Sequence, residues 1–262
     1  MNVENMKFNK VYVRDLVLEV TRKCDLKCGH CLRGDVQELN MEYELVRKII
    51  LEDSSWSFNS VVFSGGEPFL NPYIISYFIE VLDMTKNLRG NNKVENFESF
   101  YLKTNGNHES MLILTSLLKL YSMANYKDIC SLEVSADGFH FPKQIPDEFD
   151  GVSFFNPPIK NEFLLHSNDW IINEGRAEQN EIGRRRKEDS ALLYYFDYDD
   201  DADKRDIHVD TLYIAANGNV IGNCDCSFER IDNESMGNVY DDSIMDIVKR
   251  AITNDRAIQQ EF

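Results

Sequence analysis

Three cysteines stand close together near the start of the chain, in the segment TRKCDLKCGHCLRG that covers residues 21–34. Cys24, Cys28 and Cys31 fall within eight residues, and the next cysteine along the chain is Cys130. A disulfide framework uses an even number of cysteines, and a structural zinc site uses four ligands. Three thiolates therefore suit a metal centre that keeps one coordination position open.

A second segment with unusual chemistry, Ser64-Gly65-Gly66-Glu67-Pro68, follows the apolar run 61–63. Its two adjacent glycines expose the main chain, and a carboxylate favours the binding of an ammonium group. Thr104-Asn105-Gly106 and Ser135-Ala136-Asp137-Gly138 follow two later apolar runs. Each of these segments, taken alone, could also be an ordinary turn, because Asn-Gly and Asp-Gly pairs are common in turns.

Alternating apolar and helical patterns predict the elements that position these segments. Strands are predicted at 16–20, 61–63, 100–102 and 132–134, with weaker ones at 152–155 and 170–172. Helices are predicted at 41–52, 72–82 and 111–121. Repeated strand–helix–strand units predict an α/β fold with a parallel sheet, and six strands fit a partial (β/α)6 barrel. Chemistry in such folds lies at the C-terminal ends of strands, where the cysteines and the later turn segments fall.

The rest of the chain has a different pattern. Residues 177–206 are polar, charged and poorly periodic, which predicts an insertion or a long loop. A hairpin is predicted at 211–221 around the turn Asn217-Gly218, and the returning strand leads to Cys224-Asp225-Cys226. An amphipathic helix is predicted at 244–251. The predicted domains are a barrel at 12–176, a polar insertion or loop at 177–206 and a small hairpin-plus-helix extension at 207–262.

Composition narrows the classes of function. The 262 residues carry a net charge of −17, which argues against a nucleic-acid partner because phosphate contacts need clustered Lys and Arg. No apolar run is long enough to cross a bilayer, and the N-terminus lacks the apolar stretch of a signal peptide. We therefore expect a cytoplasmic protein without a membrane partner, in a compartment where thiols stay reduced.

The spacing Cys-x3-Cys-x2-Cys after a first strand resembles the signature of the radical S-adenosylmethionine superfamily. The resemblance implies that Cys24, Cys28 and Cys31 are catalytic and hold three irons of a [4Fe–4S] cluster, whose fourth iron binds S-adenosylmethionine. Cysteine is a suitable ligand because soft thiolates favour iron–sulfur clusters. Gly29 is expected to allow close backbone approach in this segment. A zinc knuckle that borrows His30 is the alternative that the cysteine spacing alone leaves open.

The second segment matches the GGEP segment of the same superfamily, in the same order along the chain. By this resemblance Gly65, Gly66 and Glu67 bind the amino group of the methionyl moiety, and His30 takes the place of an aromatic residue beside the adenine. Asn105, Ser135 and Asp137 resemble residues of peptide-modifying relatives that lie near the cofactor. Arg176 could pair with the cofactor carboxylate or with a substrate.

The chain also departs from these relatives. They often carry an arginine about a dozen residues beyond the Ser-x-Asp-Gly segment, and Lys143 or Arg176 would have to replace it here. Cys224 and Cys226 look like the start of a SPASM or twitch extension, but such extensions use more cysteines to hold auxiliary clusters. We expect a degenerate extension and one cluster per chain. Cys130, at the opposite end of its strand, is expected to be a core residue.

The resemblance implies reductive cleavage of S-adenosylmethionine to a 5′-deoxyadenosyl radical, which abstracts hydrogen from a substrate. A peptide or protein substrate is the first hypothesis, and a small metabolite or nucleotide is the second. The implied electron donor is a protein such as flavodoxin or ferredoxin. A non-catalytic iron–sulfur or zinc protein is the alternative from another class, and it would not need the GGEP segment.

Overall fold

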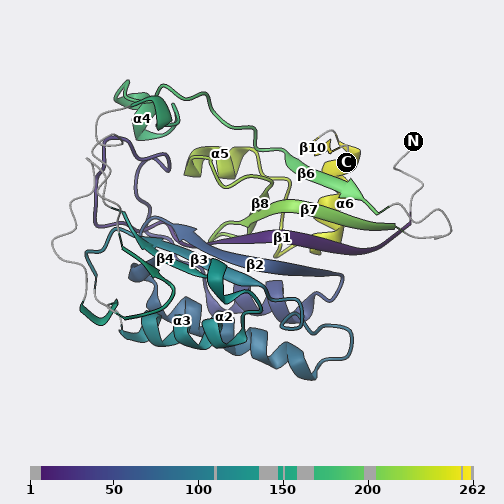
Figure 1. The fold of residues 1–262 in the computed structure, drawn as a ribbon. Coiled ribbons are helices and arrows are strands. Elements are labelled where there is room, and N and C mark those ends of the chain that lie inside the picture. Colours follow the sequence, from purple (N-terminus) through teal and green to yellow (C-terminus); the bar gives the residue numbers. More distant parts are fainter. Residues whose placement is uncertain are drawn as a thin grey trace.

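The computed structural model describes residues 7–108, 111–135, 147–149, 151–157, 168–197, 205–254 and 256–260. Within them, ten strands form one sheet with the order β10-β6-β7-β1-β2-β3-β4-β5, and β8 and β9 continue from β7 (Figure 1). The strands are β1 (Phe8–Thr21), β2 (Trp56–Gly65), β3 (Ser99–Thr104), β4 (Ser131–Val134), β5 (Phe155–Asn156), β6 (Leu192–Phe196), β7 (Arg205–Ile214), β8 (Asn219–Ile221), β9 (Gly237–Asn238) and β10 (Ala257–Gln259).

Strands β1 to β5 are parallel neighbours in chain order, and they correspond to βα units. Their helices are α1 (Tyr43–Arg47), which a π-helical turn at Lys48–Glu52 continues, α2 (Pro72–Met84) and α3 (Met111–Met123). Pro72 occupies the first turn of α2, where its missing N–H costs nothing. Because parallel strands end at the same edge, the loops after β1, β2 and β3 meet at one end of the molecule, beside the end of β4 (Figure 1).

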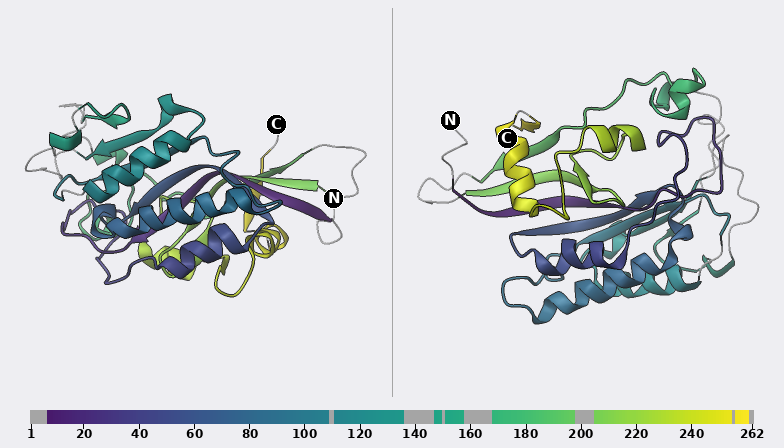
Figure 2. Two further views of the ribbon diagram at one scale, coloured as in Figure 1. Left: turned by 90° about the horizontal axis from the view of Figure 1, so that it is seen from below. Right: turned by 180° about the vertical axis from the view of Figure 1, so that it is seen from behind.

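The two faces of the sheet differ in character. On the outer face, Leu16, Val61 and Leu102 belong to the large hydrophobic cluster that also includes side chains of α1, α2, α3 and α6 (Ile244–Thr253). On the inner face, Val17 and Tyr213 form a smaller cluster with residues of α5 (Phe228–Asn233). The helices therefore lie on both sides of the sheet, as the two views in Figure 2 show.

The α/β class and the first four predicted strands are confirmed, and β5 falls at the end of the weaker run 152–155. The predicted strand at 170–172 is wrong. Trp170 ends a 3-10 turn (Asn168–Trp170) and is 69% exposed, while Ile172 makes only an isolated bridge with Arg185. An exposed tryptophan and one bridge do not extend the sheet.

One edge of β1 pairs with β2, and its other edge pairs with β7. The β1–β7 pair is parallel, with Val17 opposite Tyr213. The predicted hairpin is confirmed as β7 and β8, with Gly218 at φ +86° in its turn, and the predicted closing helix is α6. Part of the predicted loop at 177–206 is wrong, because Leu192–Phe196 forms β6, antiparallel to β7. Its run of five apolar and aromatic side chains alternates between buried and partly buried, as expected of a strand.

No helix among the described residues has the length and apolar character needed to cross a membrane.

Candidate functional site

The cysteine loop, residues 22–34, follows β1 at the end of the sheet where the parallel strands finish (Figure 1). Cys24, Cys28 and Cys31 are partly buried. The Cys31 N–H donates to the Cys28 carbonyl at 3.2 Å, so the second and third cysteines lie on one tight turn. Burial raises the pKa of the Cys24 thiol to about 11, so this thiol keeps its proton at neutral pH unless a metal displaces it.

All three thiols line one cavity of about 860 Å³. The cavity brings together the other predicted site residues that the structure describes: His30, Gly65, Gly66, Glu67, Asn105, Ser135 and Arg176. Asp137 and Lys143 lie outside the described residues. Residues from four strand ends and from α4 (Arg176–Gln179) thus surround a space large enough for a cofactor and part of a substrate.

The glycine segment, Ser64–Pro68, packs directly against the start of the cysteine loop. The Gly66 N–H donates to the Thr21 carbonyl and the Glu67 N–H to the Lys23 carbonyl, both at 2.8 Å. A Cβ at Gly65 would lie 2.0 Å from the Thr21 oxygen, and one at Gly66 would lie 2.1 Å from the Lys23 oxygen. The two glycines are therefore required for the contact between the two segments.

Glu67 is 1% exposed, and its carboxylate accepts hydrogen bonds from inside the protein. Oε1 accepts from the Phe69 N–H at 3.0 Å and from the Thr104 hydroxyl at 2.7 Å, and Oε2 accepts from the Asn105 N–H at 2.7 Å. Burial raises the pKa of Glu67, although these hydrogen bonds oppose the shift. The carboxylate thus joins the ends of β2 and β3 as well as facing the cavity.

Asp25 is a site residue that sequence reasoning missed. Its Oδ1 accepts from the Asn105 amide at 2.7 Å, and its Oδ2 accepts from the Asn107 amide at 3.0 Å. These hydrogen bonds hold the pKa of Asp25 below its usual value against the opposing effect of partial burial. Asp25 therefore holds the cysteine loop against the turn after β3. The one feature of the sequence that pointed to a role for Asp25 is its position next to Cys24.

Arg176 lies at the start of α4 and contacts the cysteine loop. Its N–H donates to the Cys31 carbonyl at 2.9 Å, and its guanidinium lies 3.1 Å from Asp35 and 3.4 Å from the Cys28 carbonyl. Gly175 has φ +60°, and a Cβ there would lie 2.2 Å from the Leu32 oxygen. This glycine allows α4 to pack against the loop.

The C-terminal segment, residues 222–234, closes another side of the cavity. Cys224, Asp225 and Phe228 line it, whereas Cys226 is fully buried in the smaller hydrophobic cluster. Arg33 of the cysteine loop spans the contact, because it donates to the Cys226 carbonyl at 2.6 Å and to the Ser64 hydroxyl at 3.1 Å. Cys130 is buried at the opposite end of its strand, as predicted.

A buried ionic network also ties the cysteine loop to the C-terminal segment. Arg22 is 1% exposed and lies 2.6 Å from Glu19 Oε1. Its two terminal nitrogens donate to both oxygens of Asp232 at 2.7 and 2.9 Å. Glu19 also accepts from the Tyr213 hydroxyl at 2.7 Å and from the Ala216 N–H at 3.0 Å. The buried charges of this network, Arg22 and Glu19, both have hydrogen-bonding partners, as buried charges require, and Asp232, which is 37% exposed, completes it from the surface.

The donor set fits an iron–sulfur cluster. Among the residues that the structure describes, no three His, Cys, Asp or Glu side chains converge as needed for a single metal ion. A cluster makes a different demand, because each thiolate binds its own iron and the ligands need to face a shared space. The three thiols of the cysteine loop face such a space.

No protein-family model matches the chain, and no curated protein matches it. Among solved structures, native anSMEcpe with bound AdoMet and Kp18Cys peptide is 13% identical, with a TM-score of 0.44 over 94% of this chain and 83% of that chain. Polyhistidine-tagged anSMEcpe with bound AdoMet is 22% identical, with a TM-score of 0.34 over 49% of this chain and 34% of that chain. Streptococcus suis SuiB bound to precursor peptide SuiA is 14% identical, with a TM-score of 0.33 over 90% of this chain and 64% of that chain. The function proposed below rests on the residues of this chain.

Proposed function

We propose that this protein is a radical S-adenosylmethionine enzyme that modifies a peptide or protein. The observation that supports this most is the junction of the cysteine loop with the glycine segment. Two backbone hydrogen bonds of 2.8 Å join them, and both line the same cavity. A zinc knuckle needs only the cysteines, whereas a cofactor that bridges a cluster and an ammonium site needs both segments side by side.

Cys24, Cys28 and Cys31 would hold the [4Fe–4S] cluster, because they are the thiols that share the cavity on one loop. When bound, the cluster and S-adenosylmethionine supply one-electron cleavage of the sulfonium and hydrogen abstraction from the substrate. The protein holds the loop in place. Asp25 fixes it to the turn after β3, and Arg33 fixes it to the C-terminal segment.

The glycine segment would bind the methionyl end of S-adenosylmethionine. Gly65 and Gly66 bring the main chain to the cavity wall, and Glu67 adds a buried carboxylate that favours an ammonium group. Since Glu67 also joins β2 to β3, its removal would loosen the wall as well as remove a charge. Arg176 and Asn105 would contact the cofactor from α4 and β3, and His30 and Ser135 would line its space.

One cluster per chain is proposed, without an auxiliary cluster in the C-terminal extension. Cys226 is 0% exposed and packs with Val17, Tyr213 and Phe228, so its sulfur faces apolar side chains. Cys224 packs against the same cluster and also lines the cavity. A cluster that is held by cysteines alone normally takes four, and this segment supplies two.

Anaerobic reconstitution followed by iron and sulfide analysis tests the cluster. About four irons per chain are expected in the wild type, as for one [4Fe–4S] cluster. The Cys24→Ala/Cys28→Ala/Cys31→Ala variant should hold none. A variant with Cys130→Ala is the matched control, because this thiol is buried away from the cavity, and it should keep the full iron content. Stoichiometric iron in the triple variant would contradict both the assignment and the single-cluster proposal.

Cofactor binding separates an enzyme from a non-catalytic iron–sulfur protein. Glu67→Ala should weaken S-adenosylmethionine binding by at least tenfold in calorimetry while the iron content stays unchanged. A reconstituted wild type that holds its cluster but does not bind S-adenosylmethionine would support the non-catalytic alternative.

The peptide substrate rests on the Ser-x-Asp-Gly segment and on the C-terminal extension that closes the cavity. A short precursor peptide encoded beside this protein would be the first substrate to assay, and turnover of a nucleotide or another small metabolite in its place would overturn this part of the proposal. We place the enzyme in the reducing cytoplasm, with flavodoxin or ferredoxin as electron donor.

A further inference from the structure

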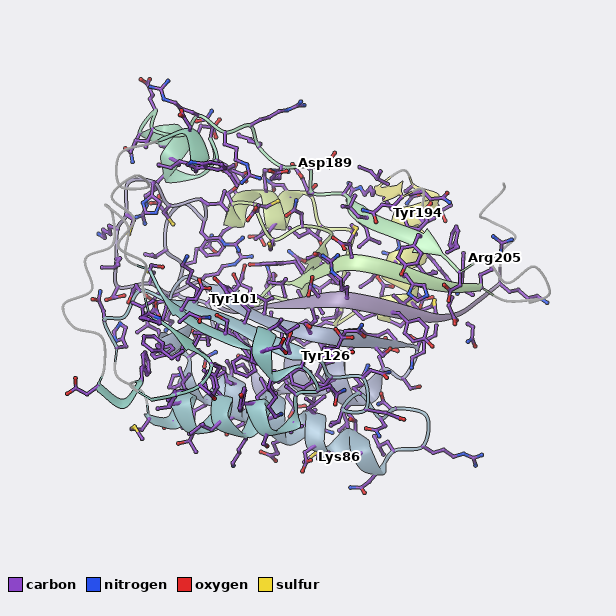
Figure 3. All side chains as sticks on the ribbon, viewed as in Figure 1. Lys86, Tyr101, Tyr126, Asp189, Tyr194 and Arg205 are labelled. Atoms are coloured by element: carbon purple, nitrogen blue, oxygen red, sulfur yellow. The ribbon has the colours of Figure 1, made fainter. Side chains whose placement is uncertain are left out.

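The inner face of the sheet carries a row of polar side chains across three strands, away from the cysteine loop. We call Tyr101, Lys103, Glu133 and Asn156 the polar wall. In the parallel register Lys103 lies opposite Glu133, and Glu133 lies opposite Asn156, so these side chains emerge on the same face. All four line the cavity. Figure 3 labels Tyr101, which projects from β3 on the face opposite α2 and α3.

The neighbouring positions on these strands are apolar and belong to the outer core. Phe100, Leu102 and Leu132 are at most 1% exposed in the large hydrophobic cluster. Along β3 and β4, apolar side chains therefore point toward the helices and alternate with polar side chains that point toward the cavity. Near β1 and β7 the inner face packs against α5 through Val17 and Tyr213, and the part of it that lines the cavity there, at Val17 and Val62, is apolar. The polar wall is thus the part of this face that offers charged and polar groups to a ligand.

Glu133 is the acidic group of this wall, and its carboxylate has unused capacity to accept hydrogen bonds. Its Oε2 accepts from the Tyr101 hydroxyl at 2.8 Å and lies 3.9 Å from the Lys103 ammonium, beyond hydrogen-bond distance. Its Oε1 receives only a long contact of 3.4 Å from the Ser131 hydroxyl among the described residues. The Asn156 amide donates to that same hydroxyl at 2.8 Å. A carboxylate can accept about four hydrogen bonds, so Oε1 is available to a donor in the cavity.

We propose that Glu133, held by Tyr101, is a substrate-anchoring subsite that binds a cationic side chain, an ammonium or a guanidinium, of the peptide substrate. This inference rests on the proposed function for the substrate being a peptide, and it names the chemistry of one of its side chains. The subsite lies on β3 and β4, whereas the cysteine loop follows β1 and the glycine segment ends β2. A substrate anchored at the wall would therefore extend across the cavity toward the cysteine loop.

Charge favours a cation over a neutral donor at this position. A hydrogen bond from an ionised donor to a carboxylate is about twice as strong as a neutral one, and the net charge of −17 attracts cations to the surface. Lys103 opposes this preference, because its ammonium stands near the same carboxylate and is half exposed. An incoming cation has to displace the Lys103 ammonium or bind beside it against charge repulsion. Replacing this lysine with an uncharged residue should therefore strengthen the binding of a cationic side chain at Glu133.

The test uses the reconstituted full chain with S-adenosylmethionine and three probe peptides: acetyl-Gly-Lys-Gly-amide, acetyl-Gly-Arg-Gly-amide and acetyl-Gly-norleucine-Gly-amide. Affinities are measured by ligand-observed NMR titration at low ionic strength. At least one cationic peptide should bind wild type about tenfold more tightly than the norleucine peptide. Glu133→Gln should abolish that preference, and Lys103→Met should increase it several-fold. Glu80→Gln is the matched control for the loss of one negative charge, because Glu80 is exposed on α2 outside the cavity, and it should leave the preference unchanged.

Three results would overturn the inference: no preference for either cationic peptide in the wild type, a preference that survives Glu133→Gln, or an equal loss in Glu80→Gln. Binding is measured without turnover, so a failure here is distinct from a failure of the proposed function. That second failure would appear as a protein that holds no cluster or does not bind S-adenosylmethionine.

Discussion

The two walls of the cavity are built in different ways. The wall formed by β1 to β4 places its chemistry at consecutive strand ends, and each segment lies only a few residues beyond its strand. The wall formed by the C-terminal segment contributes through contacts between residues that are far apart in the chain. Arg22 and Asp232 are 210 positions apart, and Arg33 and Cys226 are 193 apart.

This difference separates residues that perform chemistry from residues that hold them in place. The three cysteines and the glycine segment would contact the cofactor. The positioning residues are Arg22, Glu19 and Asp232. Arg22 donates to the carboxylates of both Glu19 and Asp232, and Glu19 also accepts from the Tyr213 hydroxyl, so these groups join the cysteine loop to the C-terminal segment. The C-terminal segment is thus an integral part of the cavity, since its helix α5 packs on the inner face of β1 and β7 at Val17 and Tyr213.

The largest effect on stability is expected from breaking the buried network. Arg22→Met would leave Glu19 buried without its cationic partner, and it should lower the free energy of unfolding by about 3–5 kcal/mol. Arg14→Met is the matched control, because Arg14 is 61% exposed and pairs with Asp15 and Asp210 on the surface, and it should cost less than about 1 kcal/mol. Denaturant unfolding measures both. Equal losses would show that the network does not join the two walls.

A smaller effect is expected at the junction of the cysteine loop and the glycine segment. Gly66→Ala would place a methyl group 2.1 Å from the Lys23 oxygen, so backbone must shift, and about 1–3 kcal/mol of stability should be lost. S-adenosylmethionine affinity should fall by at least tenfold. Gly29→Ala is the control within the cysteine loop, because its Cβ would meet Ile182 at an ordinary 3.4 Å. It should change stability by less than about 0.5 kcal/mol and keep the cluster.

The smallest effect concerns acid stability. Hydrogen bonds from Arg22, Asn217 and Asn219 lower the pKa of Asp232 in the folded protein, against partial burial. A lowered pKa means that the unfolded chain binds the proton first, so the stabilisation is present above the usual Asp value of about 3.8 and is lost as pH falls through the folded value. Asp232→Asn should therefore show a shallower loss of unfolding free energy than wild type between pH 6 and pH 3. Parallel curves would contradict the linkage.

Most of the residues that line the cavity were predictable from sequence because they lie in short local segments. The cysteine spacing, the glycine segment and Asn105 each follow a short apolar run, and parallel strands must bring such ends together. The use of Gly29 stays a prediction, because a Cβ there would meet only the side chains of Ile182 and Asn180, whereas Gly65, Gly66 and Gly175 allow close approaches between backbone segments. Which glycine is needed depends on the segment packed against it, and that segment lies elsewhere in the chain.

The pairing of β7 with β1 and the contacts of Asp25 and Asp232 were not predictable, because they join residues that are far apart in the chain. β7 was expected in a separate extension, yet it completes the sheet beside β1, because strand pairing is decided by tertiary contacts rather than by local pattern. Asp25 accepts a hydrogen bond from Asn105, which is 80 positions away, and Asp232 pairs with Arg22, which is 210 positions away. Both aspartates are exposed, as charged residues usually are, and no spacing rule marks the few exposed carboxylates that bind a distant partner.

The most direct test of the central claim is the formation of 5′-deoxyadenosine. Reconstituted wild type, reduced anaerobically with S-adenosylmethionine, should release 5′-deoxyadenosine and methionine, detected by mass spectrometry. The Cys24→Ala/Cys28→Ala/Cys31→Ala variant should release none, while Cys130→Ala should match wild type. A wild type that holds a cluster and binds S-adenosylmethionine but forms no 5′-deoxyadenosine under any reductant would contradict the claim, as would equal release from the triple variant.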